Sequence, residues 1–132
     1  MREFEGRVRL VFKDFPLPFH SLAAPAHEAA RCAGSLGKYW AYHDRLFTEQ
    51  PDFEREELIA YAVEVGLPRE AFTRCLDERR FAGAVQADLA EGRANGVDGT
   101  PTFFINGQKL VGALPADAFR EAIRDALRQP PR

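Results

Sequence analysis

The segment from Thr100 to Val111 constrains the fold of this chain more than any other. A Thr-Pro pair precedes the apolar run Thr102–Ile105, and Asn106–Gly107 separates that run from a second one at Lys109–Val111. Asn-Gly is the dipeptide that two-residue hairpin turns favour, because both of its residues tolerate a positive φ. The segment therefore predicts two antiparallel strands joined by a tight turn.

Most of the remaining chain is predicted to be helical. Arg7–Phe12 alternates around apolar and β-branched residues and predicts one strand near the N-terminus. Apolar positions at helical spacing predict five helices before the hairpin and one after it. Their approximate ranges are Leu22–Leu36, Lys38–Gln50, Glu54–Val65, a short helix with Phe72, Cys75 and Leu76, then Glu78–Ala94 and Pro115–Arg128. This order predicts one α/β domain over residues 1–132, with a helical insertion at about 21–95.

Composition and charge exclude several classes of function. Of the 132 residues, 45% are hydrophobic, and the formal net charge is −2. Acidic and basic side chains are interleaved, so the clustered basic face of a nucleic-acid-binding protein is absent. No apolar run is long enough to span a membrane, and no apolar stretch follows the charged start as it does in a signal peptide. We expect a cytoplasmic protein, or an extracytoplasmic one if its N-terminus is truncated.

The histidines and aromatic residues indicate no bound group. His20, His27 and His43 lack the spacing of four that places two ligands on one helix face, and zinc needs three or four converging ligands. We therefore predict neither a metal nor a cofactor. The aromatic residues Tyr39, Trp40 and Tyr42 are interpreted as core packing in preference to a ligand platform.

Several short motifs occur in an order that identifies a family. They are Val11–Leu17 followed by His20, Ala29–Ala33, Gly37–Trp40, His43–Phe47, Gly66–Leu67 with Phe72, Cys75–Leu76, and Gly96–Gly107. In this order they resemble the DsbA-like thiol–disulfide oxidoreductases, which have a thioredoxin fold. The resemblance runs from about Arg7 to Leu127. It implies a truncated thioredoxin-like fold made of a strand, an inserted helical bundle, a β-hairpin and a C-terminal helix.

The resemblance also implies a peptide-binding loop. In the family, a cis proline precedes the hairpin, and the main chain before it pairs with an extended peptide. Gly99, Thr100, Pro101 and Thr102 stand at that loop in this sequence. Taken alone, the Thr-Pro pair would instead be read as an ordinary trans proline that opens a strand.

The family's nucleophile has no counterpart here. It is the first cysteine of a Cys-x-x-Cys pair at a helix N-terminus, where the thiol pKa is lowered. This chain has two cysteines, Cys32 and Cys75, and it starts at what corresponds to the family's second strand. We therefore predict no catalytic residue and no dithiol exchange by this chain alone.

Three interpretations of the cysteine pair remain open. Cys32 and Cys75 are either free, buried apolar residues, or a structural disulfide, since some DsbA-like proteins carry a second, non-catalytic pair. Redox catalysis through them is the third interpretation. Neither lies at an evident helix N-terminus beside a basic group, which argues against this last one.

The family's first strand lies between its second strand and the hairpin. Without it, Val8–Phe12 and Thr102–Ile105 lose a shared neighbour and expose strand edges, which invite pairing with another chain. We therefore expect a homo-oligomer or a partner that completes the sheet, and an extended peptide as a further ligand.

Three functions follow from these observations. The first is a DsbA-like protein that is redox-inactive alone, so whether the chain is an enzyme stays open. The second is an oxidoreductase domain completed by a missing N-terminal segment or a partner chain. The third is a glutathione-dependent isomerase or transferase, although such enzymes typically have an apolar residue where Thr100 stands.

Overall fold

The structure is a computed structural model that describes residues 2–129. The chain divides into two compact units, one up to Glu91 and one from Gly92 onward. Each unit has its own packing. The organisation predicted above, one domain over residues 1–132 with an insertion at about 21–95, stays a prediction.

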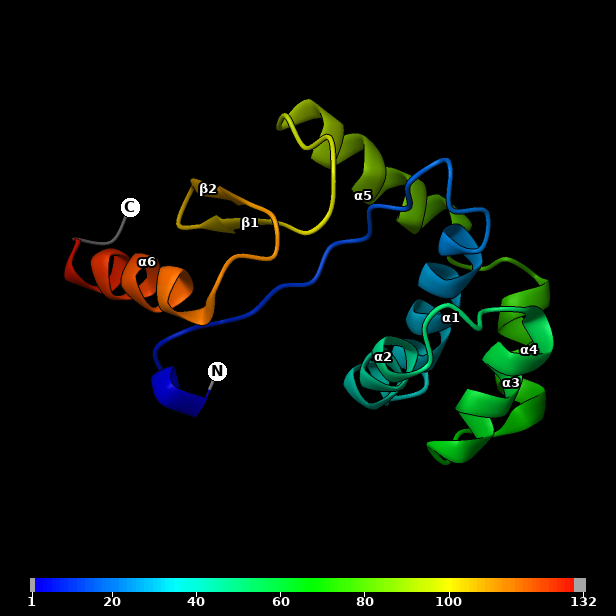
Figure 1. Cartoon of the computed structure of the whole chain (residues 1–132). Coiled ribbons are helices and arrows are strands. Elements are labelled where there is room, and N and C mark those ends of the chain that lie inside the picture. The colour runs from blue at the N-terminus through cyan, green and yellow to red at the C-terminus, as the bar shows by residue number, and fades with distance from the viewer. Residues whose placement is uncertain (1, 130–132) are drawn as a thin grey trace. The chain divides into compact units, whose positions relative to one another are not determined.

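The first unit is helical (Figure 1). A short 3-10 helix, Arg2–Phe4, precedes an extended stretch that leads into the helices. The helices are α1 (Ala23–Ser35), α2 (Tyr39–Thr48), α3 (Arg55–Glu64), α4 (Arg69–Asp77) and α5 (Ala82–Ala94), the last of which ends in the second unit. The predicted helices are confirmed to within two residues, except at the start of α5.

Helix α5 begins at Ala82, whereas the sequence predicted a start at Glu78. Arg79 has a φ of 50°, in the left-handed region that ends helices. The N–H of Arg80 donates to the carbonyl of Cys75 over 3.2 Å, which closes the end of α4. The apolar pattern runs through this break, so periodicity alone did not reveal it.

Local sequence explains the other helix ends. Gly37 has a φ of 90° after α1, and the N–H of Lys38 donates to the carbonyl of Ala33 over 2.9 Å. Helix α3 begins with a capping box, in which the N–H of Glu54 donates to the Glu57 carboxylate over 3.0 Å. Both arrangements satisfy backbone groups that a helix end leaves without partners.

The core of the first unit lies around α1, which contacts α2, α3 and α4. Ala29 and Ala33 are fully buried on α1, and their small side chains allow the other helices to approach closely. Tyr42 is fully buried, its hydroxyl donates to the carbonyl of Leu58 over 2.8 Å, and its ring meets Phe72 at 5.4 Å. Core packing is thus confirmed for Tyr42, but it was wrong for Trp40, which is 45% exposed.

The predicted strand at Arg7–Phe12 was wrong. Residues 8–17 have neither helix nor strand, and Figure 1 draws them as a plain trace. A strand exists only where its backbone N–H and C=O groups pair with a neighbouring strand. In the part of the chain described, the one sheet contains only β1 (Thr102–Ile105) and β2 (Gln108–Val111). The alternating pattern of a strand is present in the sequence, but no described strand pairs with these residues.

The second unit contains the predicted hairpin, followed by α6 (Ala116–Arg128). Strands β1 and β2 are antiparallel, with Phe103 opposite Leu110 and Phe104 opposite Lys109. Asn106 and Gly107 have φ values of 48° and 90°, which confirms the predicted turn. The Phe103 ring packs edge-on against Phe119 of α6 at 4.7 Å, so one face of the hairpin rests on this helix.

None of the helices within residues 2–129 is both long enough and apolar enough to cross a membrane.

Candidate functional site

The loop Gly99–Thr102, predicted to bind peptides, leads directly into β1. The Thr100–Pro101 peptide bond is cis. The Thr102 hydroxyl donates to the carbonyl of Gly99 over 2.7 Å, and the N–H of Gly112 donates to the carbonyl of Pro101 over 2.8 Å. These two hydrogen bonds fix both ends of the loop to the hairpin.

The loop leaves polar main chain accessible. Thr100 and Pro101 are exposed, and the main-chain groups of Thr100 have no hydrogen-bond partner among the described residues. β1 pairs with β2 along one edge, and no other described strand pairs with its second edge. An extended peptide gains affinity from open edges of this kind. The structure does not test this role of Gly99, Thr100, Pro101 and Thr102, which stays a prediction.

The two cysteines form a disulfide between α1 and α4. The Cα atoms of Cys32 and Cys75 are 5.9 Å apart, and each residue is 1% exposed within the helical core. Between free cysteines and a disulfide, the disulfide is the interpretation found, and the structure does not test redox catalysis through the pair. The interpretation as free buried cysteines was wrong, because these core positions on α1 and α4 face each other within bonding distance.

The disulfide has a direct chemical consequence. The sequence contains only these two cysteines, and neither is free. Exchange requires an accessible thiolate, and access is one of the factors that set its rate. In this state the chain has no thiol to supply.

A charged cluster, which the sequence analysis missed, ties the extended N-terminal stretch to α1 and α5. Asp14 is 2% exposed. Its carboxylate accepts from the Arg31 Nε over 2.6 Å and lies 2.8 Å from the His27 Nδ1. The Asp88 carboxylate accepts from the Arg31 Nη2 over 2.6 Å and from the Asp14 N–H over 2.9 Å. Each oxygen of the buried Asp14 carboxylate therefore has a polar partner.

The cluster keeps Asp14 ionised. Burial raises the pKa of Asp14, but the hydrogen bonds and charges of His27 and Arg31 outweigh burial and hold it below its ordinary value of 3.8. Burial lowers the pKa of Arg31, but its contacts with Asp14 and Asp88 outweigh burial and raise it. The arrangement is an ion network that holds structure, and it presents no unpartnered acid or base to a substrate.

Little in the sequence pointed to this cluster. His27 and Arg31 are four residues apart and share a face of α1, which is a readable signal. Asp14 and Asp88, however, are 74 positions apart, and only the fold brings them together.

The remaining histidines lie among aromatic rings. His43 meets the rings of Phe12 at 4.8 Å and Phe47 at 4.7 Å, and His20 meets Phe19 at 4.5 Å. Within residues 2–129, no three histidine, cysteine or carboxylate side chains gather as metal ligands would.

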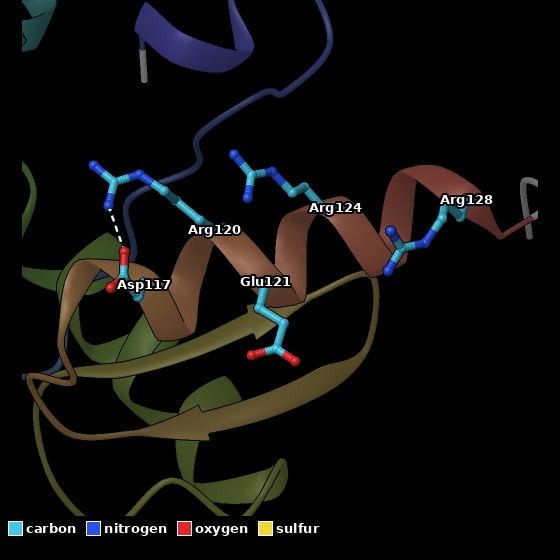
Figure 2. A pocket seen from close by; sticks show the side chains of 5 residues that line it. All are labelled: Asp117, Arg120, Glu121, Arg124 and Arg128. Carbon is cyan, nitrogen blue, oxygen red and sulfur yellow. Dashed lines mark hydrogen bonds and ion pairs between the residues drawn. The ribbon is translucent and has the colours of Figure 1, made fainter.

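A second charged surface lies on α6. A hollow of about 380 Å³ is lined by Asp117, Arg120, Glu121, Arg124 and Arg128. Figure 2 shows Arg120 and Arg124 extending from the same side of the helix, with the Asp117 carboxylate against the Arg120 guanidinium at 2.8 Å. All five residues belong to one helix, and ion pairs three positions apart are usual on a solvated helix face. This surface carries no chemistry that we can assign.

Comparison with known proteins identifies the family. The family model described as Thioredoxin matches residues 2–125. A thioredoxin-like oxidoreductase from Silicibacter pomeroyi DSS-3 superposes with a TM-score of 0.85 and 24% identity, over 97% of this chain and 73% of that one. Oxidised BdbD from Bacillus subtilis superposes with a TM-score of 0.74 and 24% identity, over 86% of this chain and 66% of that one. At this identity both likenesses show the fold.

The curated relatives carry a different name. A Na(+)/H(+) antiporter NhaA from Herminiimonas arsenicoxydans is 41% identical over 100 residues, which are 76% of this chain and 16% of that protein. The match spans between 16% and 20% of the first four such relatives. The chain therefore resembles a small part of each antiporter. The family match and the superpositions show that this chain belongs to the thioredoxin family and has the fold of its DsbA-like oxidoreductases.

Proposed function

We propose that this chain is a thioredoxin-family module that does not perform dithiol exchange by itself and that holds an extended polypeptide at the loop Gly99–Thr102. The observation that carries the first part is the disulfide, which occupies both cysteines in the core, where each is 1% exposed. The chain has no thiol to attack a substrate disulfide, and its own disulfide is too buried for a substrate thiolate to reach, so the module contributes binding rather than chemistry.

The peptide-holding part is supported by the loop and the strand beside it. Hydrogen bonds from Thr102 and Gly112 fix the loop, so its exposed main chain is already ordered before a peptide arrives. Preorganisation of this kind lowers the entropic cost of binding. The free edge of β1 offers further main-chain groups to the same peptide.

An NMR titration tests the peptide-holding part. A short, extended peptide without cysteine is added to the ¹⁵N-labelled chain, and we expect the amide signals of Gly99, Thr100 and Thr102 to shift together and saturate. Thr100→Pro removes the open N–H and should weaken binding. The control variant is Thr48→Ala at the end of α2, which should leave the titration unchanged. Thr73→Pro is unsuitable as a control because the proline would break α4. Shifts that spare the loop would contradict the proposal.

The second candidate function is an oxidoreductase domain that is completed by a missing N-terminal segment or a partner chain. It is favoured by the two superposed proteins, a thioredoxin-like oxidoreductase and oxidised BdbD, each of which extends beyond the matched part. Adding the portion of the Silicibacter pomeroyi protein outside the match, as a separate chain, should then restore disulfide reduction. The glutathione-dependent alternative stays a prediction, and no contact in the described residues favours it.

The curated relatives support a further proposal, which concerns whether the module is a separate protein or part of a larger one. Because parts of proteins named Na(+)/H(+) antiporters match with up to 41% identity, the chain would act as the thioredoxin-type part of a larger transporter. An antibody raised against the chain distinguishes the two settings in its own cells. A band near 14.8 kDa indicates a separate module, and a band several times heavier indicates a larger protein.

For localisation, we propose an oxidising compartment in place of the cytoplasm. Disulfides form and persist in secreted and periplasmic proteins and are kept reduced in most cytosols. Acid quenching of intact cells, followed by alkylation of the unfolded chain without reductant, should leave Cys32 and Cys75 unlabelled if they are bonded in place. Labelling of both residues would indicate the cytoplasm.

A further inference from the structure

An extended, unpaired segment of the first unit has the properties of a strand that lacks its neighbour. Residues 8–13 contain neither helix nor strand. Among the described residues, none forms a main-chain hydrogen bond with them. Leu10 and Val11 are 50% and 57% exposed, although their side chains are apolar. Open backbone groups next to exposed apolar side chains are what an added strand would cover.

Hydrogen bonds hold the segment at both ends, so its extended conformation is fixed at these two points. At its start, the N–H of Arg7 donates to the carbonyl of Phe4 over 2.9 Å. At its end, the N–H of Asp14 donates to the Asp88 carboxylate, and the Asp14 carboxylate accepts from Arg31. A docking strand would therefore meet an edge that is already fixed in place.

An aromatic cluster lies against the same segment. It consists of Phe12, Tyr39, Trp40, His43 and Phe47, which are linked by ring contacts of 4.7–6.3 Å between centroids. Trp40 and Phe47 are 45% and 58% exposed. Exposed Trp, Tyr and Phe side chains are enriched at the centres of binding interfaces.

A cavity provides room for a side chain beside the cluster. It measures about 500 Å³ and is lined by Val11, Phe12, Tyr39 and Phe81, with Lys13, Arg31 and Asp88 as its charged members. Edge-strand binding commonly combines main-chain pairing with a pocket for an alternate side chain. The segment, the aromatic cluster and the cavity supply both parts.

The charges of the segment indicate which strand would fit. Arg7, Arg9 and Lys13 are all basic, and the Lys13 ammonium already lies 3.4 Å from the Glu91 carboxylate. Two antiparallel copies paired about Leu10 would set Arg7 opposite Lys13, and pairing about Arg9 would set two copies of Arg9 face to face. Pairing about Val11 would set Arg9 opposite Lys13, and pairing about Phe12 brings no like charges together but joins only Val11, Phe12 and Lys13 of the segment. Like charges directly opposite each other destabilise a sheet, so a strand with acidic residues is favoured over a second copy.

We propose that residues 8–13 and the aromatic cluster form a docking surface for an extended strand of a partner polypeptide, in which acidic residues alternate with apolar ones. Of the two partners expected from the sequence, this selects a polypeptide that adds a strand and not a homo-oligomer. The surface and the loop Gly99–Thr102 consist of different residues, so either proposal stands or fails without the other.

The test uses the full chain and a defined probe. The probe is the acetylated, amidated heptapeptide Glu-Val-Thr-Val-Glu-Val-Thr, with two comparison peptides. One has Lys in place of both Glu residues, and the other is N-methylated at alternate positions and cannot pair as a strand. Trp40 is the only tryptophan, so its fluorescence reports on the aromatic cluster. We expect a saturable change, protection of the amides of residues 8–13 from hydrogen exchange, and about tenfold weaker binding of the Lys peptide.

Two matched variants locate the surface. Val11→Asp should abolish binding of the acidic peptide, because it places a carboxylate on the docking edge. Val63→Asp makes the same change on α3, at a position that is 41% exposed, and should bind as the wild type does. Circular dichroism checks that both variants remain helical. If Val11→Asp unfolds, hydrogen exchange on the wild type with and without the peptide decides the question.

Four results would overturn the proposal. They are no saturable change in Trp40 fluorescence at millimolar peptide, equal binding of all three peptides, loss of binding in both variants, and protection of residues 8–13 in the free monomer. A dimer whose protection of these residues rises with protein concentration would instead make a second copy the occupant, and the partner chemistry would be wrong.

Discussion

Cys32 on α1 and Cys75 on α4 are bonded to each other in the interior of the helical unit, and each residue is only 1% exposed. The bond closes a loop whose ends are 43 positions apart and which includes α2 and α3. The same bond therefore fastens the helices together and leaves neither cysteine as a thiol.

Loss of the disulfide should weaken the helical unit. The double variant Cys32→Ser with Cys75→Ser is expected to lose about 2–4 kcal/mol of unfolding free energy, because the unfolded chain regains the freedom that the closed loop removed. Urea unfolding monitored by circular dichroism measures this loss. Wild-type protein unfolded with dithiothreitol should match the double variant, which should itself be insensitive to reductant. A wild type whose stability ignores reductant would contradict the structural role.

Removing the charge of Asp14 should destabilise the contact between the extended segment and the helices. Asp14→Asn keeps the size of the side chain but leaves Arg31 with one carboxylate in place of two, and we expect a loss of about 2–3 kcal/mol at pH 7. The matched control is Asp117→Asn, whose side chain is 94% exposed and which should change stability by less than about 0.5 kcal/mol.

The same pair of proteins should show a defined pH dependence. Because the folded pKa of Asp14 lies below its ordinary value of 3.8, the stability it contributes is present above that pH and is lost as pH falls through the folded pKa. The difference between wild type and Asp14→Asn should therefore stay constant from neutral pH down to the ordinary pKa and shrink below it. Urea unfolding across this range checks the prediction, and a difference that grows on acidification would contradict it.

Gly107 should be the most sensitive glycine of the hairpin. Gly107→Ala is expected to cost about 1–2 kcal/mol, because its φ of 90° is unfavourable for a residue with a Cβ atom. Hydrogen exchange of the amides of β1 and β2 should accelerate accordingly. Gly83→Ala is the matched control, since no atom lies within 4 Å of the added Cβ and the residue is in α5, where alanine is the better helix former. Equal effects of the two changes would show that the turn is not strained by alanine.

The hairpin and most helices could be predicted because their signals are local. Asn106–Gly107 fixes the turn, and the apolar alternation around it fixes which residues face α6, as the contact of Phe103 with Phe119 shows. Helix ends followed from Gly37 and from proline positions. The start of α5 was missed because the left-handed turn at Arg79 has no glycine or proline to mark it.

Contacts between residues that are far apart in the sequence could not be predicted. The strand at Arg7–Phe12 was inferred from its alternation, but pairing depends on a neighbour that alternation does not supply. Asp14 and Asp88 meet only through the fold, because they are 74 positions apart in the sequence. The sequence left open whether Cys32 and Cys75 are free or bonded to each other, and the structure shows that they form a disulfide between α1 and α4.

The central claim is that this chain alone has no nucleophile for dithiol exchange, and the rate of insulin reduction by dithiothreitol tests it most directly. The assay compares the full chain with buffer and with a thioredoxin that has a Cys-x-x-Cys pair. We predict that the chain gives the buffer rate, and that alkylation of the unfolded chain without reductant labels neither Cys32 nor Cys75. A rate clearly above buffer that is abolished by Cys32→Ser or Cys75→Ser would contradict the account, because it would show that the buried disulfide takes part in exchange.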